Sequence, residues 1–195
     1  MLCGRTVFAR GDAIMTRDII KPIWYYAGLP ILMITIFLVQ VGRINPFIIL
    51  WHELIIIFGY IAAVVDVKTR KIPNKLVIIM FIAWMLTITP KLLFDIDAST
   101  ALLRDSVLGF VVSMGLFLTV YIVSRKGLGG GDVKFMAVSG LYLGLGGAIS
   151  TILCGSILAA MTGLILIAFK KIGRRDQIPL APFLYIGILV TILFQ

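Results

Sequence analysis

The sequence predicts an all-α protein, a polytopic bundle of about seven transmembrane helices. Apolar residues make up 61% of the 195 residues and charged residues only 14%, which leaves too little charge to cover a water-soluble domain. The apolar residues form long runs, and most basic residues lie in the short segments between these runs. Helices are the structure by which such runs satisfy their backbone hydrogen bonds within a bilayer.

Seven apolar runs define the expected spans, because about 20 apolar residues in a helix are needed to cross the hydrocarbon core. In chain order they are Ile23–Val41, Phe47–Val65, Leu76–Phe94, Val107–Val123, Phe135–Leu145, Ala148–Phe169 and Leu180–Phe194. The third begins after Pro73 and Asn74, where asparagine is a favourable N-cap. The fifth begins after a glycine run that ends at Asp132, a second residue suited to capping a helix.

The fifth run is shorter than a full span and could continue into the sixth as one long helix. We predict a turn between them at Gly144–Gly147, because glycine-rich segments of this kind interrupt helices. The charges support this division. Lys134 and Lys170 flank the pair of runs and should face the same side of the membrane, which requires an even number of crossings.

Small residues recur at four-residue spacing on three of the expected spans. Such faces let helices approach closely in a bilayer, where no hydrophobic effect drives helices together. The residues are Gly109 and Ser113, Gly140 and Gly144, and Gly155, Ala159 and Gly163.

The distribution of basic residues predicts the orientation. With seven spans, all of the 18 lysine and arginine residues except Arg43, Lys91 and Arg104 fall on one side, which the positive-inside rule assigns to the cytoplasm. The N-terminus, with its basic tail of residues 1–22, is then cytoplasmic and the C-terminus is outside. The opposite side holds, in one loop, Asp95, Asp97 and Asp105.

Several kinds of protein and site are excluded or disfavoured. No cleavable signal peptide is evident in the basic tail, although Met15 is a possible alternative start. The cysteines, Cys3 and Cys154, form no Cys-x-x-Cys pair, so neither a thiol zinc site nor a disulfide framework is expected. The single histidine, His52, excludes a multi-histidine metal site and gives a serine triad little support.

Two aspartates at the ends of spans are the strongest functional signal. Asp66 closes the second span ahead of Lys68 and Arg70, and Asp132 opens the fifth behind Gly129–Gly131. A carboxylate at membrane depth is costly unless it has a partner or a function. Both aspartates fall on the cytoplasmic side, and two carboxyl groups on one side are the minimum requirement for aspartic-protease chemistry.

Each acidic residue alone also has an ordinary interpretation. Asp66 could pair with Lys68 or Arg70 at the headgroup level, and Asp132 could cap the fifth span after a flexible turn. A phosphate-binding loop is excluded, because no strand precedes the glycines and no Gly-Lys-Ser/Thr follows. Glycines beside a catalytic acid would admit another backbone, such as that of a peptide substrate. Glu53, inside the second span, is expected to bond a neighbouring helix or extend outward, with a proton path as the alternative.

Two motifs together resemble the type IV prepilin peptidases, membrane aspartic proteases of the Gly-x-Gly-Asp type. The first motif contains Asp66, Lys68, Arg70, Ile72, Pro73 and Asn74. The second contains Gly129, Gly130, Gly131, Asp132, Val133 and Lys134. The segment Ile178–Phe183 is similar to a family stretch that opens the last helix. The resemblance covers about residues 47–195, within an integral-membrane peptidase domain expected at 23–195.

The resemblance implies cleavage of pilin-like precursors behind a short basic leader, at the cytoplasmic face of the inner membrane. Asp66 and Asp132 match the family's two catalytic positions. Larger members carry a further cytoplasmic domain with paired Cys-x-x-Cys motifs and methylate the new N-terminus. That domain is absent from this sequence, so methyltransferase activity is doubtful. The size is similar to short members serving tight-adherence or conjugative pili, or to archaeal preflagellin peptidases, and these alternatives stay open.

The expected mechanism uses two carboxyl groups that share one proton and activate a water, with no metal or cofactor. The helix dipole favours negative charge on Asp132, at a helix start, over Asp66, at a helix end. We therefore expect Asp66 to hold the shared proton more often, although Lys68 and Arg70 favour its ionised form.

The expected partners are a prepilin-like membrane protein and the lipid bilayer, with a pilus or secretion machine as a further candidate. One alternative function is a small proton-coupled transporter using Asp66, Asp132 and Glu53, although it predicts acids spread through the membrane depth. A non-catalytic scaffold of a pilus or secretion machine is the other, and it leaves the glycines unexplained. Nucleic-acid binding is not expected, because the basic clusters are short loops beside the spans.

Overall fold

The computed structural model describes residues 29–30, 32–42, 45–94, 96–124, 128–170 and 178–194, and all regular structure in these ranges is helical. The chain divides into two units, Met1–Arg43 and Ile44–Gln195. In the first unit, residues 29–30 and 32–40 are helical. The basic tail of residues 1–22, with Cys3 and Met15, lies outside the described residues, as does the beginning of the first expected span.

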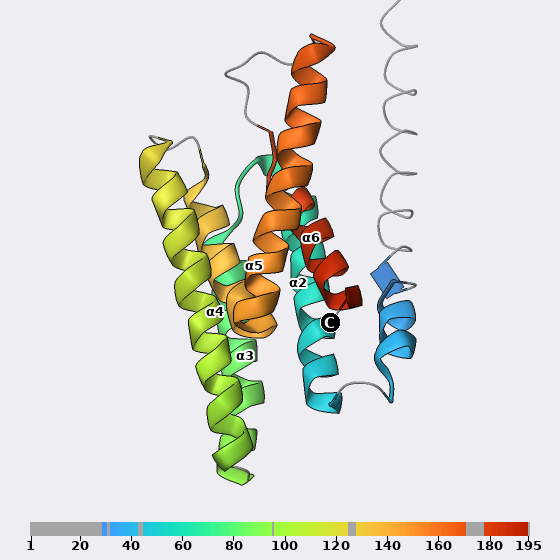
Figure 1. Cartoon of the computed structure of the whole chain (residues 1–195), viewed down its shortest axis with the longest axis vertical. Helices are drawn as coiled ribbons and strands as arrows, with labels where there is room; N and C mark the ends of the chain where they lie inside the picture. Colours follow the sequence, from blue (N-terminus) through green and yellow to red (C-terminus); the bar gives the residue numbers. More distant parts are fainter. Residues whose placement is uncertain are drawn as a thin grey trace, which may run out of the picture. The chain divides into compact units, whose positions relative to one another are not determined.

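In the described part of the second unit, five helices form a bundle (Figure 1). They are α2 (Pro46–Thr69), α3 (Asn74–Phe94), α4 (Ile96–Val123), α5 (Gly130–Ala168) and α6 (Ala181–Phe194). α2 begins where its sequence favours a helix start, because Asn45 accepts a hydrogen bond from the Phe47 N–H (3.1 Å) and Pro46 takes the first position. It ends at Arg70, which adopts the left-handed conformation (φ 53°).

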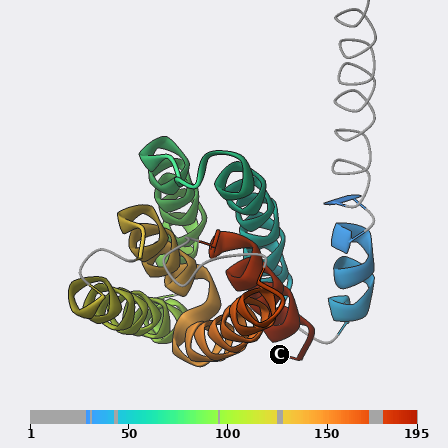
Figure 2. The ribbon, with the colours of Figure 1, turned by 90° about the horizontal axis from the view of Figure 1, so that it is seen from above.

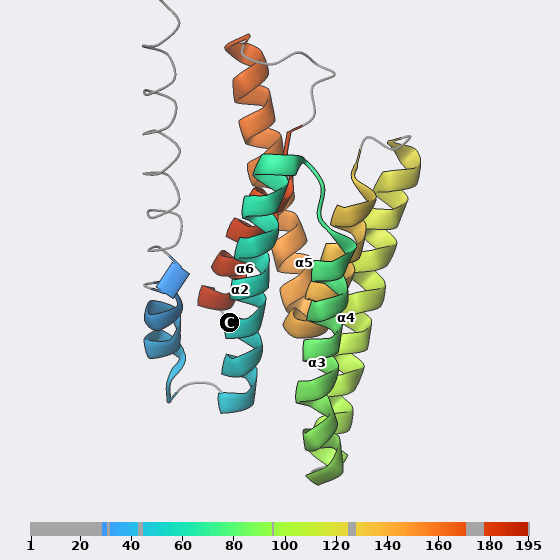
Figure 3. The same cartoon turned by 180° about the vertical axis from the view of Figure 1, so that it is seen from behind.

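α5 consists of two helices, because Gly144 interrupts it with φ 66° and ψ −176°. This backbone conformation is open almost exclusively to glycine. The chain turns back at this point, and the two halves run in opposite directions (Figures 1 and 3). The predicted break between the fifth and sixth expected spans is therefore confirmed.

The number of spans differs from the expectation of about seven. By length and composition, four of the described helices can cross a membrane, namely α2, α3, α4 and α5, and α6 is a shorter apolar helix of 14 residues. α5 counts once although Gly144 divides it, and the first expected span is described only in part. The structure is a helical membrane bundle, with fewer long spans than the apolar runs predict.

The beginning of α4 corrects a second expectation. α4 starts at Ile96 and not at Val107, so Asp97 and Asp105 lie within a helix and not in a loop, while Asp95 lies outside the described residues. The charged residues of this segment lower its hydropathy without opposing a helix. Hydropathy therefore marks only the apolar part of α4.

Small residues mark the closest helix contacts, as predicted. A Cβ atom added to Gly109 of α4 or to Gly140 of α5 would meet the backbone of the other residue. Gly155 of α5 similarly lies against Leu184 of α6, with 3.0 Å between the position of an added Cβ and the Leu184 Cα. Figure 2 shows α6 between α2 and the second half of α5. Large apolar side chains on the outer faces of α3 and α4 remain exposed, as a lipid environment favours.

Candidate active site

The two motif aspartates come from different helices whose ends lie at one end of the bundle. Asp66 lies in the last turn of α2 and Asp132 in the first turn of α5 (Figures 1 and 3). Both side chains are buried: Asp66 is 4% exposed and Asp132 is 8% exposed. The two carboxyl groups are near enough to interact electrostatically. The fold therefore brings together the two acids that the sequence singles out.

The carboxyl group of Asp66 is held by a third helix. Its Oδ2 atom accepts a hydrogen bond of 3.1 Å from the N–H of Ala181, the first residue of α6. The first N–H groups of a helix have no partner within the helix, so they are available to a side-chain acceptor. Lys68 and Arg70 are exposed, and no ion pair joins either of them to Asp66 in the described part of the chain. The interpretation of Asp66 as a headgroup-level ion pair is therefore not supported.

Asp132 has one carboxyl oxygen held and one unpaired. Gly129 is the N-cap of α5, so Asp132 is not the capping residue that its position suggested. Instead the Gly129 N–H donates to the Asp132 carboxyl group, as an acid in the first turn does in a capping box. The Oδ1 atom is buried and has no hydrogen-bond partner among the residues described. A buried polar atom without a partner is costly, so this oxygen is suited to bind a water or a substrate group.

The three glycines before Asp132 have three different surroundings. The position of an added Cβ on Gly129 lies 2.8 Å from Asp132 Oδ2, and that on Gly131 lies 3.0 Å from the Ile72 carbonyl oxygen. An added Cβ on Gly130 would meet nothing within 4 Å. The backbone that approaches Gly131 is thus the chain's own loop between α2 and α3. Only Gly130 remains open to another molecule.

The same loop is joined to α5 a second time. Lys134 Nζ donates a hydrogen bond of 3.1 Å to Asn74 Oδ1. Asn74 is the first residue of α3. The sequence predicted it as the N-cap of this helix and did not predict its contact with Lys134. Pro73 and Lys134 are exposed. The contacts of Gly131 and Lys134 fix the loop after Asp66 against the start of the helix that carries Asp132.

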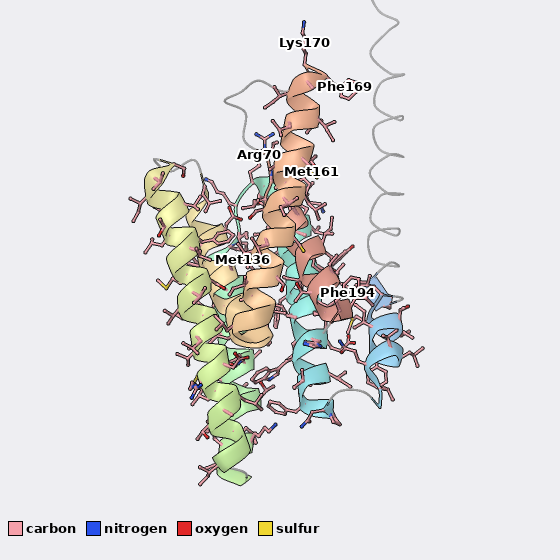
Figure 4. All side chains as sticks on the ribbon, in the orientation of Figure 1. Arg70, Met136, Met161, Phe169, Lys170 and Phe194 are labelled. Carbon is pink, nitrogen blue, oxygen red and sulfur yellow. The ribbon has the colours of Figure 1, made fainter. Side chains whose placement is uncertain are left out.

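Basic side chains surround this end of the bundle. Figure 4 labels Arg70 and Lys170 there, and the neighbouring loops and helix starts add others. The described basic residues at this end are Lys68, Arg70, Lys71, Lys75, Lys134 and Lys170. They lie on the surface at this end of the bundle, and Lys170 lies beyond the end of α2, where α5 ends.

Two contributors to the site had no assigned role in the sequence, namely Ala181 and Ile72. Both act through backbone atoms, which residue type does not reveal. The signal for Ala181 was the segment Ile178–Phe183, which resembles a family stretch that opens the last helix and whose prolines favour the beginning of a helix.

Glu53 lies apart from this site. It precedes Asp66 by about 20 Å along α2, at 1.5 Å per residue. Both of its carboxyl oxygens are buried without a hydrogen-bond partner in the described ranges, so neither the expected bond to a neighbouring helix nor the outward extension is found. His52 is also buried, at 2% exposed.

The comparisons with known proteins all indicate the same family. The profile of the type IV leader peptidase family matches residues 53–164, a range that contains both aspartates. The chain is similar to the prepilin leader peptidase/N-methyltransferase of Bacillus subtilis (strain 168), at 28% identity over 135 residues, which is 69% of this chain and 51% of that protein.

Proteins with the same name from two other organisms are also similar. The one from Pectobacterium carotovorum subsp. carotovorum is 28% identical over 148 residues, covering 73% of this chain and 50% of the relative. The one from Stutzerimonas stutzeri is 29% identical over 147 residues, covering 72% and 48%. The chain thus spans about half the length of these relatives. No solved structure matches significantly.

Proposed function

The chain belongs to the type IV leader peptidase family, and from this we propose that it is an aspartic endopeptidase that removes the leader of type IV pilin-like precursors. Asp66 and Asp132 are its two catalytic residues. The observation that carries the proposal is the meeting of two buried, interacting carboxyl groups from separate helices at one end of the bundle. The names of the relatives support the substrate class.

In the proposed reaction one carboxyl group is ionised and the other is protonated. The ionised carboxylate takes a proton from a water, and the water oxygen attacks the carbon of the scissile carbonyl. The protonated carboxyl group donates a hydrogen bond to the carbonyl oxygen. The C–N bond then breaks, and the leaving amine takes up a proton from the carboxyl pair. Which aspartate begins with the proton stays a prediction.

The proposed orientation places this end of the bundle at the cytoplasmic face of the inner membrane. The six described basic residues around the site support it, because lysine and arginine concentrate on cytoplasmic surfaces. The hydrophobic helix of the substrate would lie in the bilayer beside the bundle. Its basic leader would reach the anionic headgroups around the site.

The direct test is cleavage of a purified prepilin by the purified chain in liposomes. We expect a cut behind the basic leader, identified by sequencing the new N-terminus. A correctly inserted protein that leaves several prepilins intact over long incubation would contradict the proposed function.

We predict that Gly131→Ala lowers the rate of leader removal by about tenfold while the protein remains folded. The added Cβ would lie 3.0 Å from the Ile72 carbonyl oxygen, so the α2–α3 loop and the helix carrying Asp132 must separate by a few tenths of an ångström. Catalytic rates are sensitive to displacements of this kind. The measurement is the initial cleavage rate, with helix content by circular dichroism as the folding control.

Gly130→Ala is the matched variant, because an added Cβ there meets nothing within 4 Å. It should lower the rate less than Gly131→Ala does, because it leaves the contact with Ile72 unchanged and affects only a substrate that approaches Gly130. Equal rates for the two variants would contradict the assigned role of Gly131.

Removal of the backbone donor to Asp66 should also lower activity. We predict that Ala181→Pro reduces the cleavage rate by about 10- to 100-fold, because proline has no N–H to donate to Asp66 Oδ2. Proline is compatible with the first position of a helix, so α6 should still form. Ala181→Gly, which keeps the N–H, should be much less affected. Similar losses for both variants would indicate that helix packing, and not this hydrogen bond, matters.

A further inference from the structure

A pocket with polar and apolar lining lies away from the aspartate pair, between α2, α4 and the turn of α5. Its volume is about 210 Å³. Its lining includes Trp51, His52, Asp105, Ser106, Tyr142 and Gly144. Asp105 and Gly144 lie toward the end of the bundle where α3 gives way to α4, opposite the end that holds Asp66 and Asp132 (Figure 1).

Two aromatic rings form part of the pocket wall, and their polar atoms are already bound to the protein. Trp51 Nε1 donates to Thr87 Oγ1 (2.9 Å), and the Tyr142 hydroxyl donates to the Met80 carbonyl (2.6 Å). The rings lie edge to face, with 6.3 Å between centroids. Both residues border the pocket although they are almost entirely buried, at 3% and 2% exposed, so a small part of their surface lines it, and aromatic surface attracts cations.

The pocket also contains a carboxylate with spare acceptor capacity. Asp105 Oδ1 accepts one hydrogen bond, from the Leu145 N–H (3.2 Å), whereas an ionised carboxylate offers about four acceptor positions. Asp105 remains exposed. Among the residues that the structure describes, no lysine or arginine lines the pocket. The described lining therefore combines one negative charge with aromatic residues, Ser106 and His52.

We propose that this pocket binds a primary ammonium group, held by Asp105 and by the rings of Trp51 and Tyr142. A contact between an ammonium group and an aromatic ring already occurs next to these residues. Lys91 Nζ lies 4.5 Å from the ring centroid of Phe47, and the Phe47 ring packs on Trp51. The ammonium group can come from the ethanolamine headgroup of a phospholipid or from a soluble amine. The chemistry is shared, and the experiment separates the two sources.

The test measures binding to the purified full chain with two probes. Native mass spectrometry measures retention of phosphatidylethanolamine, with phosphatidylglycerol as the lipid that lacks an ammonium group. Tryptophan fluorescence measures titration with ethanolammonium chloride. Retention of phosphatidylethanolamine that ethanolammonium displaces identifies the headgroup. Binding of ethanolammonium without selective lipid retention identifies a soluble amine.

Asp105→Asn is the main variant, because asparagine keeps a carbonyl oxygen for the Leu145 N–H and removes only the charge. We expect affinity for the ammonium probe to fall by about tenfold or more. Tyr142→Leu should weaken binding several-fold through loss of the ring, and Tyr142→Phe should not. Asp132→Asn, which changes a carboxylate at the other end, should bind normally, so this test does not depend on the proposed peptidase activity.

Three results would overturn the proposal. The first is the failure of both probes to bind the folded wild-type chain. The second is equal retention of the two lipids without ethanolammonium binding. The third is an unchanged affinity in the folded Asp105→Asn variant.

Discussion

Asp66→Asn and Asp132→Asn are each expected to lower leader removal by about 1,000-fold or more, to the limit of detection. Asparagine keeps the size of the side chain and an oxygen acceptor, but it can neither take a proton from water nor donate one to the leaving amine. Loss of one general acid or base alone removes about 10²–10⁴-fold, and both acids act on the same water. The measurement is the initial rate of prepilin cleavage in liposomes at matched amounts of inserted protein.

The double variant tests whether the two residues act as a unit. Groups that work together are strongly non-additive, so Asp66→Asn with Asp132→Asn should be no slower than either single variant. Asp12→Asn, in the N-terminal segment outside the described residues, serves as the control and should cleave normally. Substantial cleavage by either single variant would refute the two-aspartate mechanism and would favour a non-catalytic scaffold.

Gly144→Ala is expected to cause the largest loss of stability, lowering the free energy of unfolding by about 3 kcal/mol. The backbone at Gly144 has φ 66° and ψ −176°, a region in which a non-glycine residue costs about 1–3 kcal/mol. An added Cβ would also collide with the Asp105 carboxyl group. The midpoint of thermal unfolding in detergent should fall by about 5 °C or more, measured by circular dichroism.

Gly146→Ala provides the matched control two residues away. An added Cβ on Gly146 meets nothing within 4 Å, and alanine favours a helix over glycine by up to about 1 kcal/mol. This variant should be as stable as the wild type or slightly more stable. If the two variants have the same unfolding midpoint, the sharp turn at Gly144 is not the feature that divides α5.

The sequence predicts the main features of the bundle because each has a local cause. The apolar runs predict α2, α3 and α6 closely, and the cluster Gly144–Gly147 predicts the break inside α5. The prediction is wrong for the beginning of α4. Its first turns contain Asp97 and Asp105, which make this part of the helix less hydrophobic than a typical span. Hydropathy reports the depth at which a segment lies, whereas hydrogen bonding decides where a helix begins.

The meeting of Asp66 and Asp132 was also predictable, because charge placed both on one side of the membrane and the two motifs resemble one family. The backbone groups that contact this site were not predictable. Ala181 reaches Asp66 across 115 residues through a backbone N–H, and Ile72 approaches Gly131 through its backbone. Every residue other than proline has such groups, so no pattern of residue types predicts which of them will be used.

The neighbours of the glycines before Asp132 could also not be predicted from the sequence. Its composition predicted that a foreign backbone could approach next to Asp132. The fold instead uses Gly131 for the chain's own loop and leaves Gly130 open. A sequence identifies positions that tolerate a close neighbour, but the identity of that neighbour depends on tertiary contacts.

Cysteine cross-linking measures directly whether the side chains at positions 66 and 132 lie together. Asp66→Cys and Asp132→Cys would be combined in a chain with Cys3→Ser and Cys154→Ser, then oxidised in the membrane and examined by mass spectrometry. Efficient cross-linking of this pair is expected, and none for Asp66→Cys with Asp105→Cys, because Asp105 lies beside the turn of α5 and not near the end of α2 that carries Asp66. Absence of a cross-link between positions 66 and 132, even with a short bifunctional reagent, would contradict this arrangement.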